Sequence, residues 1–302
     1  MKMTLPKLSV PTSNLSADKV LMPLLQPKVL STPTSTAKMQ TSLPVQQVLN
    51  TSVTALKFNK AIQTISQWAH RHESRTVCVA NVHMLMEAYW HPKFAHHLQN
   101  ADMVTPDGMP LVWMMKLLGR KEQDRVAGMD ILQSLCQQAS EKNIKVFFMG
   151  SQPSILAQMR TRLEQEYPNL DIVAMRSLPF RPLSNKEDED LVEEIHNSGA
   201  GLVFVSLGCP KQEKWMAEHQ GHVQAVMIGL GGAFPVYAGL KSWAPLWIRQ
   251  AGLEWLYRLV QEPKRLFSRY SQTIPPFLFL ALIQLLSHYF APQKLRNTFN
   301  LH

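Results

Sequence analysis

The sequence is poor in cysteine, glycine and charge: its 302 residues include three cysteines and 13 glycines, and 18% are charged. Cys78, Cys136 and Cys209 lie in apolar or turn contexts and show neither a CxxC pair nor zinc-ligand spacing. These shortages exclude a disulfide-stapled scaffold and a collagen-like chain. With 45% apolar residues, the chain can bury a sizeable core, and we expect a globular protein of a reducing, cytoplasmic compartment.

The positive charge is concentrated at the two ends of the chain. Net charge is +9 in total, with +4 in residues 1–50, −1 in residues 51–240 and +6 in residues 241–302. Basic ends suit either a nucleic acid or an anionic membrane surface. Because the neutral middle offers no basic face with interleaved aromatic residues, we expect no nucleic-acid partner.

The first 46 residues are rich in Ser, Thr, Pro and Gln and show no sustained hydrophobic period. Such a composition cannot bury enough apolar surface to offset chain entropy, so we expect a disordered leader over 1–46. The stretch has no compact apolar segment after its early lysines, and no arginine before residue 46. Neither a secretory signal nor a transit peptide is therefore expected.

Residues 47–240 alternate short apolar runs with longer helical patterns. The expected strands are 76–80, 103–105, 145–149, 171–174, 202–207 and 225–228. The expected helices are 56–70, 84–98, 109–118, 130–142, 154–167, 186–198 and 211–219. Strands that alternate with helices of this length predict an α/β fold, with a parallel sheet covered by helices on both faces.

The pattern changes to helices alone in residues 241–302, with helices expected at 244–259, 263–270 and 274–290. The last run is shorter than a membrane span and contains Pro275 and Pro276. It suits a helix lying in a membrane interface, flanked by basic residues. A C-terminal helix packed on the protein's own core fits the same pattern.

Polar and glycine residues follow five of the expected strands. In a parallel sheet the carboxyl ends of the strands meet at one edge, where ligands bind, so these residues predict a single crevice. The candidate substrate-binding residues of these loops are Asn81, His83, Gly150, Gly208, Lys211, Gln212, Glu213, Gly231 and Gly232.

Each candidate also has a structural interpretation. Asp107 sits in Pro-Asp-Gly, which is a common turn sequence and gives it a structural interpretation. Its functional interpretation is a carboxylate that takes a proton from a hydroxyl. Asn81 caps the following helix or contacts a sugar. Gly150 precedes a helix whose N-terminus could seat a phosphate. Gly229 and Gly231 do not complete a GxGxxG motif, because Phe234 occupies the third glycine position. This argues against a nicotinamide-dependent dehydrogenase.

Arg258, Arg265 and Arg269 are spaced at i, i+7 and i+11. They share one face if the helices continue past Pro263. Three arginines on one face can bind a diphosphate through paired hydrogen bonds. Arginines that extend along an amphipathic helix toward water give the same spacing.

Together these segments resemble the WecG/TagA/CpsF family of glycosyltransferases, over about residues 77–270. The strings that carry the resemblance are ADMVTPDG (101–108), RVAGMD (125–130), VFFMG (146–150), GCPKQEKW (208–215), GLGGAF (229–234) and GLEWLYRLVQEPKR (252–265). The resemblance implies a Rossmann-like core followed by a helical, basic C-terminal appendage, residues 241–302.

The resemblance also implies an activity. It implies an inverting transferase that needs no metal or other cofactor and moves an N-acetylmannosamine-type sugar from a UDP donor. The implied acceptor is a hydroxyl of a polyprenyl-diphosphate-linked sugar, on the cytoplasmic membrane face. Asp107 falls on the family's proposed general base and Asn81 on its substrate-contacting Asn. Arg258 and Arg265 fall on the arginines of the appendage. Homo-oligomers are implied as well.

Three positions depart from the family pattern. Val79 stands where a Thr is common, Pro235 where an Asp is usual, and Trp243 where an Arg opens the appendage. These changes bear on the identity of the donor sugar. They leave a second hypothesis open, in which the protein uses another donor or only binds its ligands at the membrane.

Overall fold

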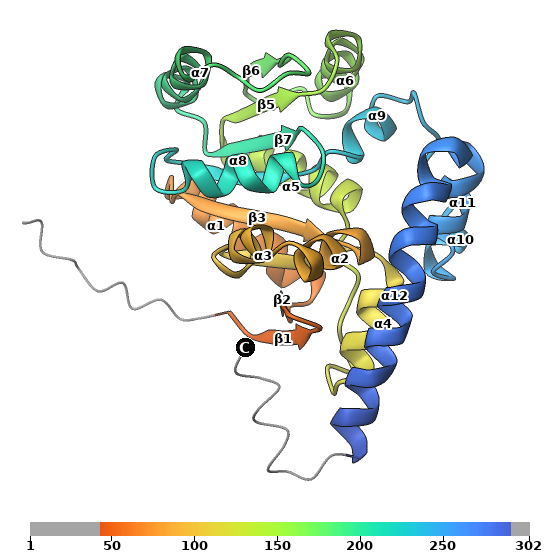
Figure 1. Ribbon diagram of the computed structural model, residues 1–302. Coiled ribbons are helices and arrows are strands. Elements are labelled where there is room, and N and C mark those ends of the chain that lie inside the picture. Colours follow the sequence, from red (N-terminus) through yellow and green to blue (C-terminus); the bar gives the residue numbers. More distant parts are fainter. Residues whose placement is uncertain (1–42, 291–302) are drawn as a thin grey trace, which may run out of the picture. The chain divides into compact units, whose positions relative to one another are not determined.

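The computed structural model describes residues 43–290, and its centre is a six-stranded parallel sheet (Figure 1). The strand order is β4-β3-β8-β7-β5-β6. The strands are β3 (Arg75–Ala80), β4 (Met103–Pro106), β5 (Val146–Gly150), β6 (Ile172–Arg176), β7 (Leu202–Ser206) and β8 (Val226–Gly229). The α/β class predicted from the sequence is confirmed.

Helices cover both faces of this sheet, so its central strands are buried on both sides. On β5, Phe147 packs into the core of one face and Phe148 into that of the other, and both are fully buried. One face carries α2 (Val82–Trp90), α3 (Pro92–Gln99), α7 (Asn185–Ser198) and α8 (Lys211–His219). The other carries α1 (Phe58–His70), α5 (Gly128–Lys142), α6 (Pro153–Glu166) and α9 (Ala233–Tyr237).

The direction of winding reverses inside the sheet. The chain builds β3 and β4 at one edge, then crosses to β5 and β6 at the other, and later inserts β7 and β8 between them. A reversal of this kind separates the loops at the carboxyl ends of the strands and opens a crevice there. The crevice is where the candidate residues converge.

An antiparallel hairpin precedes the sheet and corrects the expected leader boundary. It consists of β1 (Val45–Val48) and β2 (Thr51–Thr54), and its Val48 and Val53 are fully buried. The expected leader, 1–46, therefore runs two residues into a strand whose alternating side chains reach the core. Residues 1–42 of that leader lie outside the described residues.

Two helices expected as continuous are each broken once. The expected helix 84–98 is α2 and α3, because Pro92 begins α3 and disfavours a helical His91 before it. The expected helix 244–259 is α10 (Leu246–Gln250) and α11 (Glu254–Gln261), separated at Gly252, which has a φ of +76°. Only glycine adopts that backbone conformation readily.

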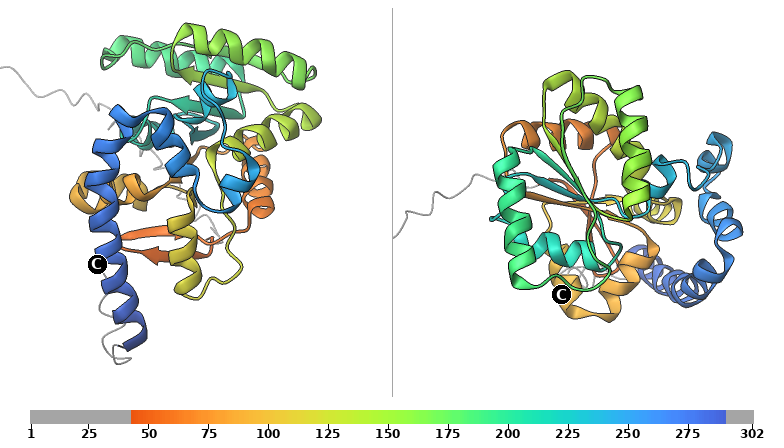
Figure 2. Two further views of the ribbon diagram at one scale, coloured as in Figure 1. Left: turned by 90° about the vertical axis from the view of Figure 1, so that its right-hand side faces the viewer. Right: turned by 90° about the horizontal axis from the view of Figure 1, so that it is seen from above.

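At the C-terminal end, the break that we expected between two helices is absent. Residues expected as two helices form one, α12 (Pro263–Phe290), which continues through Pro275 and Pro276. One side packs on the core through Phe277 and Ala281. Gln284 accepts a hydrogen bond from the backbone N of Leu49 (2.9 Å) and donates one to the carbonyl of Gln47 (3.1 Å). Figure 2 shows the helix passing the hairpin and α4 (Met109–Leu117). Side-chain packing thus maintains the helix despite two missing backbone donors.

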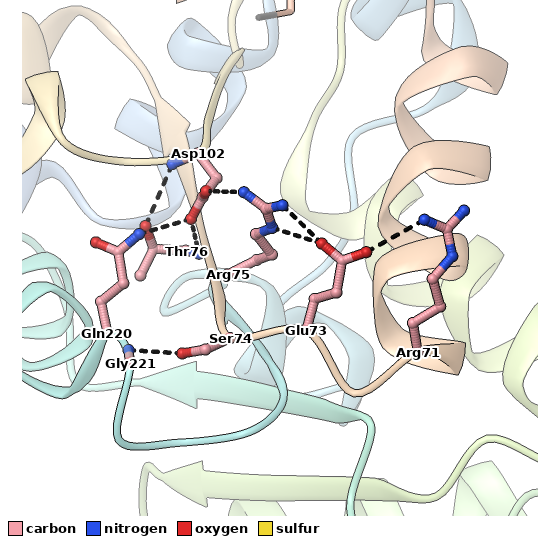
Figure 3. A network of polar contacts seen from close by, with 8 residues as sticks. All are labelled: Arg71, Glu73, Ser74, Arg75, Thr76, Asp102, Gln220 and Gly221. Carbon is pink, nitrogen blue, oxygen red and sulfur yellow. Dashed lines mark hydrogen bonds and ion pairs between the residues drawn. The ribbon is translucent and has the colours of Figure 1, made fainter. Parts of the chain in front are cut away.

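A buried ion network lies at the amino-terminal edge of the sheet, opposite the crevice (Figure 3). Asp102 pairs with Arg75 (2.6 Å) and accepts hydrogen bonds from the backbone N of Thr76 and from Gln220. The side chains of Arg75 and Asp102 are 9% and 6% exposed. The network connects β3, the start of β4 and the end of α8.

We expect Asp102→Ala to lower the free energy of unfolding by about 3–5 kcal/mol, because it leaves a buried guanidinium short of a partner. Urea denaturation monitored by circular dichroism measures this loss. Asp190→Ala is the control, because it removes a carboxylate from an exposed ion pair with Lys186 on α7, and it should leave stability unchanged. Equal stability of the two variants would contradict the assignment.

Candidate functional site

The loops at the carboxyl ends of five strands enclose one polar cavity of about 390 Å³. We refer to it as the polar cavity. Each strand end contributes one of Asn81, Asp107, Ser151, Gly208 and Gly231. The single crevice predicted from the strand ends is thus present in the structure.

A second cavity of about 290 Å³ lies beside it, and we refer to it as the apolar chamber. Its apolar walls come from α4, α11 and α12, through residues such as Trp113, Trp255 and Phe277. The appendage helices therefore form much of the apolar chamber. The residues that line both cavities are Asn81, His83, Asp107, Arg125, Glu254, Arg258 and Arg269.

Asp107 lies in this shared wall, directly after β4. Its backbone N donates a hydrogen bond to the carbonyl of Ala80 (2.7 Å), and Gly108, with a φ of +99°, turns the chain after it. Burial raises the pKa of Asp107 to about 6, against the opposing effect of the Arg125 guanidinium. A carboxylate with a pKa near neutrality is ionised at pH 7 and still basic enough to take up a proton.

Asn81 and His83 flank Asp107 at the start of α2. The side chain of Asn81 accepts a hydrogen bond from the backbone N of Met84 (3.2 Å), so the predicted helix cap is confirmed. Burial, reinforced by Arg269, lowers the pKa of His83 to about 4. His83 is therefore neutral at pH 7 and able to offer a hydrogen bond to an uncharged ligand.

Three arginines of the appendage reach the polar cavity, although they do not lie on one helix. Arg258 is on α11, whereas Arg265 and Arg269 are on α12, and the helices separate at Glu262. The helices do not continue past Pro263 as a single helical face would require, but α11 and α12 together bring the arginines to the cavity. Between residues 43 and 290, no carboxylate pairs with Arg258 or Arg269. Partly buried arginines without acidic partners are suited to an anionic ligand.

The sequence-based candidates omitted Arg125 and Glu254. Arg125 pairs with Glu254 (2.5 Å) and with Asp130 (3.0 Å), and Asp130 in turn pairs with Arg249 (3.4 Å). These pairs connect the segment between α4 and α5, and the start of α5, to α10 and α11. We refer to the four residues as the ion lattice. The string RVAGMD could have marked Arg125, but nothing local in the sequence indicates Glu254 as its partner.

Gln212 ties two glycine loops together. Its Oε1 accepts hydrogen bonds from the backbone N of Gly208 (3.1 Å) and of Gly231 (3.2 Å). Its Nε2 donates to Oε1 of Glu213 (2.7 Å), which is 1% exposed. A Cβ added at Gly229 would lie 2.7 Å from Gln212 Nε2. The side chain of Gln212 thus fills the space that the glycine leaves and fixes both loops.

Several candidates contribute indirectly or not at all. Gly232 borders the polar cavity, and a Cβ there would lie 3.1 Å from Arg258 Nη2. Gly150 and Glu213 line neither cavity. Gly150 packs against the backbone of Ser206, where an added Cβ would collide with the carbonyl, and Glu213 is buried with its carboxyl bonded to Gln212. Lys211 is exposed on the first turn of α8 and also lies outside both cavities. The expectation that these three contact the substrate directly is not supported.

The positions that depart from the family pattern border the polar cavity. Val79, Pro235 and Trp243 all line it. The Arg249 guanidinium lies over the ring of Trp243, with its Cζ 3.8 Å from the ring centroid. Among the described residues, no three His, Cys, Asp or Glu side chains are arranged to hold a metal ion.

Similarity to known proteins extends over most of the described chain. The model of the glycosyl transferase WecG/TagA/CpsF family matches residues 46–291. A protein of Bacillus spizizenii named N-acetylglucosaminyldiphosphoundecaprenol N-acetyl-beta-D-mannosaminyltransferase is 34% identical over 191 residues, which cover 63% of this chain and 72% of the relative. A protein of Bacillus subtilis with the same name is 33% identical over 185 residues, covering 59% of this chain and 70% of the relative.

We expect the buried carboxyl of Glu213 to make the stability of the folded protein depend on pH. Burial raises its pKa from 4.5 to about 7, so its favourable contribution is complete below pH 4.5 and is lost as the pH rises through 7. Glu213→Gln resembles the protonated form. We therefore expect the melting temperature of this variant, relative to the parent, to be higher at pH 8 than at pH 5.

Thermal unfolding at the two pH values measures this difference. Glu193→Gln, on the exposed face of α7, is the control and should show no such pH dependence. A Glu213→Gln shift that is the same at pH 5 and pH 8 would show that the carboxyl is not held in its protonated form by burial.

Proposed function

This chain belongs to the WecG/TagA/CpsF family of glycosyltransferases, and we propose that it transfers an N-acetylhexosamine, of the N-acetylmannosamine type, from a UDP-sugar. The acceptor is a sugar linked through a diphosphate to a polyprenyl lipid, as the names of both relatives indicate for those proteins. The product serves cell-surface polysaccharide synthesis. The observation that supports this proposal is the position of Asp107, in a wall shared by a polar cavity and an apolar chamber.

The polar cavity is the proposed donor site. Its floor is formed by the loops after β7 and β8, where the backbone N–H groups of Gly208 and Gly231 are bonded to Gln212. The loop after β7 leads into the start of α8, and the positive end of a helix favours phosphate oxygens. The Gln212 tie fixes the two loops before the ligand arrives, so their binding geometry costs little further entropy. We assign the UDP moiety to these loops.

The arginines supply the positive charge that the reaction needs. UDP departs with an additional negative charge, and the acceptor carries a diphosphate of its own. Arg258 and Arg269 border both cavities, and Arg265 borders the polar one. We propose that they bind the acceptor diphosphate and neutralise the charge around the reacting centre, so that turnover needs no divalent cation.

Asp107 is the proposed general base. The acceptor hydroxyl approaches from the apolar chamber and attacks the anomeric carbon on the face opposite UDP. As the new C–O bond forms and the bond to the UDP oxygen breaks, Asp107 takes the hydroxyl proton. A single displacement of this kind inverts the anomeric configuration.

The function is tested by UDP release from a panel of UDP-sugars, with a short-chain sugar-diphosphate lipid as acceptor and EDTA present. Acceptor-dependent release from one donor is the expected result. Binding of UDP without release from any donor would instead favour the second hypothesis, a member that binds its ligands without transferring this sugar.

Replacement of Asp107 with Asn should lower kcat by about 10²–10⁴-fold, the usual contribution of a general base. The Kd for UDP should be unchanged, because the loops that bind it are intact. Asp171→Asn, exposed at the start of β6, is the control and should retain full activity. Full activity of Asp107→Asn would refute the assignment of the base.

In the parent enzyme, kcat/KM should fall as the pH drops below about 6, because only ionised Asp107 accepts a proton. The decrease should approach tenfold per pH unit for a single essential carboxylate. Initial rates between pH 4.5 and 8 measure this dependence. A flat profile over that range would show that no group with this pKa limits turnover.

We also propose that the protein is peripheral on the cytoplasmic face of the plasma membrane. By length and composition α12 could cross a membrane, but one of its sides is buried against the core. Its other side exposes Phe279, Ile283 and Leu286, spaced at i, i+4 and i+7, with Lys264 near its start. An apolar face beside basic residues suits a helix that lies in the surface of an anionic bilayer.

Replacement of Phe279 and Ile283 by Ser should weaken binding to vesicles that contain anionic lipid by about tenfold or more, because two exposed apolar side chains no longer enter the bilayer. Vesicle co-sedimentation measures the binding. Phe180→Ser, at an 84% exposed residue before α7, is the control and should bind as the parent does. Equal weakening by both variants would place the contact surface elsewhere.

A further inference from the structure

Glu213 is a buried carboxyl that the proposed reaction does not use. It lies in the first turn of α8, is 1% exposed and lines neither cavity. Its Oε1 accepts a hydrogen bond from Nε2 of Gln212 at 2.7 Å, whereas its Oε2 is buried without a hydrogen-bond partner among the described residues. Burying a carboxyl that is only half satisfied is unfavourable. What the carboxyl contributes must therefore lie in the one residue to which it is bonded.

The carboxamide of Gln212 has to adopt one of its two orientations. Its Oε1 accepts hydrogen bonds from the backbone N of Gly208 and of Gly231, at 3.1 and 3.2 Å. If the amide were rotated by 180°, Nε2 would face these two N–H groups, and donors would meet donors. The terminal torsion of a glutamine allows both orientations. The partner of Nε2 therefore decides which one the side chain adopts.

Glu213 is that partner. A carboxyl oxygen beside Gln212 accepts a hydrogen bond from Nε2 and would repel Oε1. Both side chains are buried, since Gln212 is 5% and Glu213 is 1% exposed, so the hydrogen bond between them is shielded from competing water. The carboxyl thus directs the amide nitrogen toward itself and the amide oxygen toward the two glycine loops.

The two loops fit closely around the amide oxygen. A Cβ added at Gly231 would lie 2.9 Å from Oε1 of Gln212 and 3.2 Å from Cα of Gly208. The carbonyl of Gly231 also accepts a hydrogen bond from Oγ of Ser206, at 3.1 Å. The loop after β8 is therefore held at both polar groups of one residue, and a turn of the amide would release one of them.

This contact continues into the polar cavity. Gly208, Gly231 and Gly232 all line it. A Cβ added at Gly232 would lie 3.1 Å from Nη2 of Arg258, so the loop that Gln212 holds is the loop against which this arginine lies. A change in the orientation of Gln212 would alter both the floor of the cavity and the support of a cation above it.

We propose that Glu213 is a positioning residue of the donor site. It holds the carboxamide of Gln212 in the one orientation that joins the loops after β7 and β8, and it thereby sets the geometry in which UDP binds. The inference rests on the proposed function, which assigns UDP to these loops. Glu213 acts through Gln212 and does not touch the donor. Loss of its acceptor oxygen therefore lowers donor affinity while every group that lines the cavity remains.

Isothermal titration with UDP compares three variants with the parent. Glu213→Leu preserves much of the side-chain volume but offers no acceptor, and it should raise the Kd for UDP about tenfold or more. Glu213→Gln retains an acceptor oxygen for Nε2 and should stay within about threefold of the parent. Glu218→Leu, at an exposed carboxylate on the same helix that pairs with Lys214, is the control and should bind UDP as the parent does.

An exchange of the two side chains tests the polarity of the hydrogen bond. Gln212→Glu alone places two carboxyl groups against each other in a buried site and should weaken UDP binding. In the double variant Gln212→Glu/Glu213→Gln, the carboxylate at position 212 accepts from both glycine N–H groups and from the amide at position 213. The double variant should recover most of the affinity that Gln212→Glu loses. A purely packing role for position 213 predicts no recovery.

Hydrogen exchange measured by mass spectrometry reports on the two loops without any ligand. Glu213→Leu should speed exchange in the peptides that contain Gly208 and Gly231, and it should leave exchange in β3 at the rate of the parent, which shows that the variant is folded. Glu213→Gln and Glu218→Leu should exchange as the parent does in all of these peptides.

The proposal would be overturned if Glu213→Leu matched the parent in both UDP affinity and loop exchange. Equal losses in Glu213→Leu and Glu213→Gln, or a double variant no better than Gln212→Glu, would overturn it as well. If the parent binds no UDP and Glu213→Leu still loosens both loops, the proposed function is wrong and the positioning of the loops stands. If the parent transfers sugar from a UDP donor and Glu213→Leu behaves as the parent does, only the positioning role is wrong.

Discussion

The ion lattice of Arg125, Asp130, Arg249 and Glu254 is the interaction on which the rest of the site depends. It joins the sheet domain to α10 and α11 through charged side chains that are 14–29% exposed, in addition to the Gln284 bonds between α12 and the hairpin. An ion pair that is partly shielded from water is costly to break from one side, because the remaining charge stays desolvated. The lattice therefore fixes the appendage helices at one position over the ends of the strands.

The two cavities follow from that docking. The sheet domain alone supplies the glycine loops and Asp107, and it would leave them open to solvent. With α11 and α12 in place, Arg258 lies against Gly232 and closes the polar cavity, while Trp255 and Phe277 form the apolar chamber. The appendage thus contributes both the cationic and the apolar groups of the proposed acceptor site. Donor and acceptor enter from different sides of one carboxylate.

Much of this arrangement could be predicted from local sequence. Parallel strands end at one edge of a sheet, so the residues after each strand had to converge, and Asp107 and Asn81 are found where that rule puts them. What could not be predicted depends on contacts between distant residues. Arg125 and Glu254 are 129 positions apart, and no periodicity connects them. Similarly, α12 continues through two prolines because of packing that its own sequence does not reveal.

The role of Gln212 shows the same limit within one motif. Its place in the string GCPKQE marks it as a candidate, but the sequence does not indicate where its carboxamide points. In the structure both amide atoms are occupied by protein, with the oxygen on two glycine loops and the nitrogen on Glu213. The position of Gln212 in the motif suggests a ligand contact, but its hydrogen bonds show that it holds two loops together. Only the hydrogen-bond partners distinguish the two roles.

The central claim is that Asp107 separates a donor site from an acceptor site. It is tested most directly by a crystal structure of the Asp107→Asn variant with a UDP-sugar and a short prenyl-diphosphate sugar. The account predicts UDP on the loops at Gly208 and Gly231, the prenyl chain in the apolar chamber, and the acceptor hydroxyl beside residue 107. A complex with both substrates in one cavity, or with the hydroxyl remote from residue 107, would contradict it.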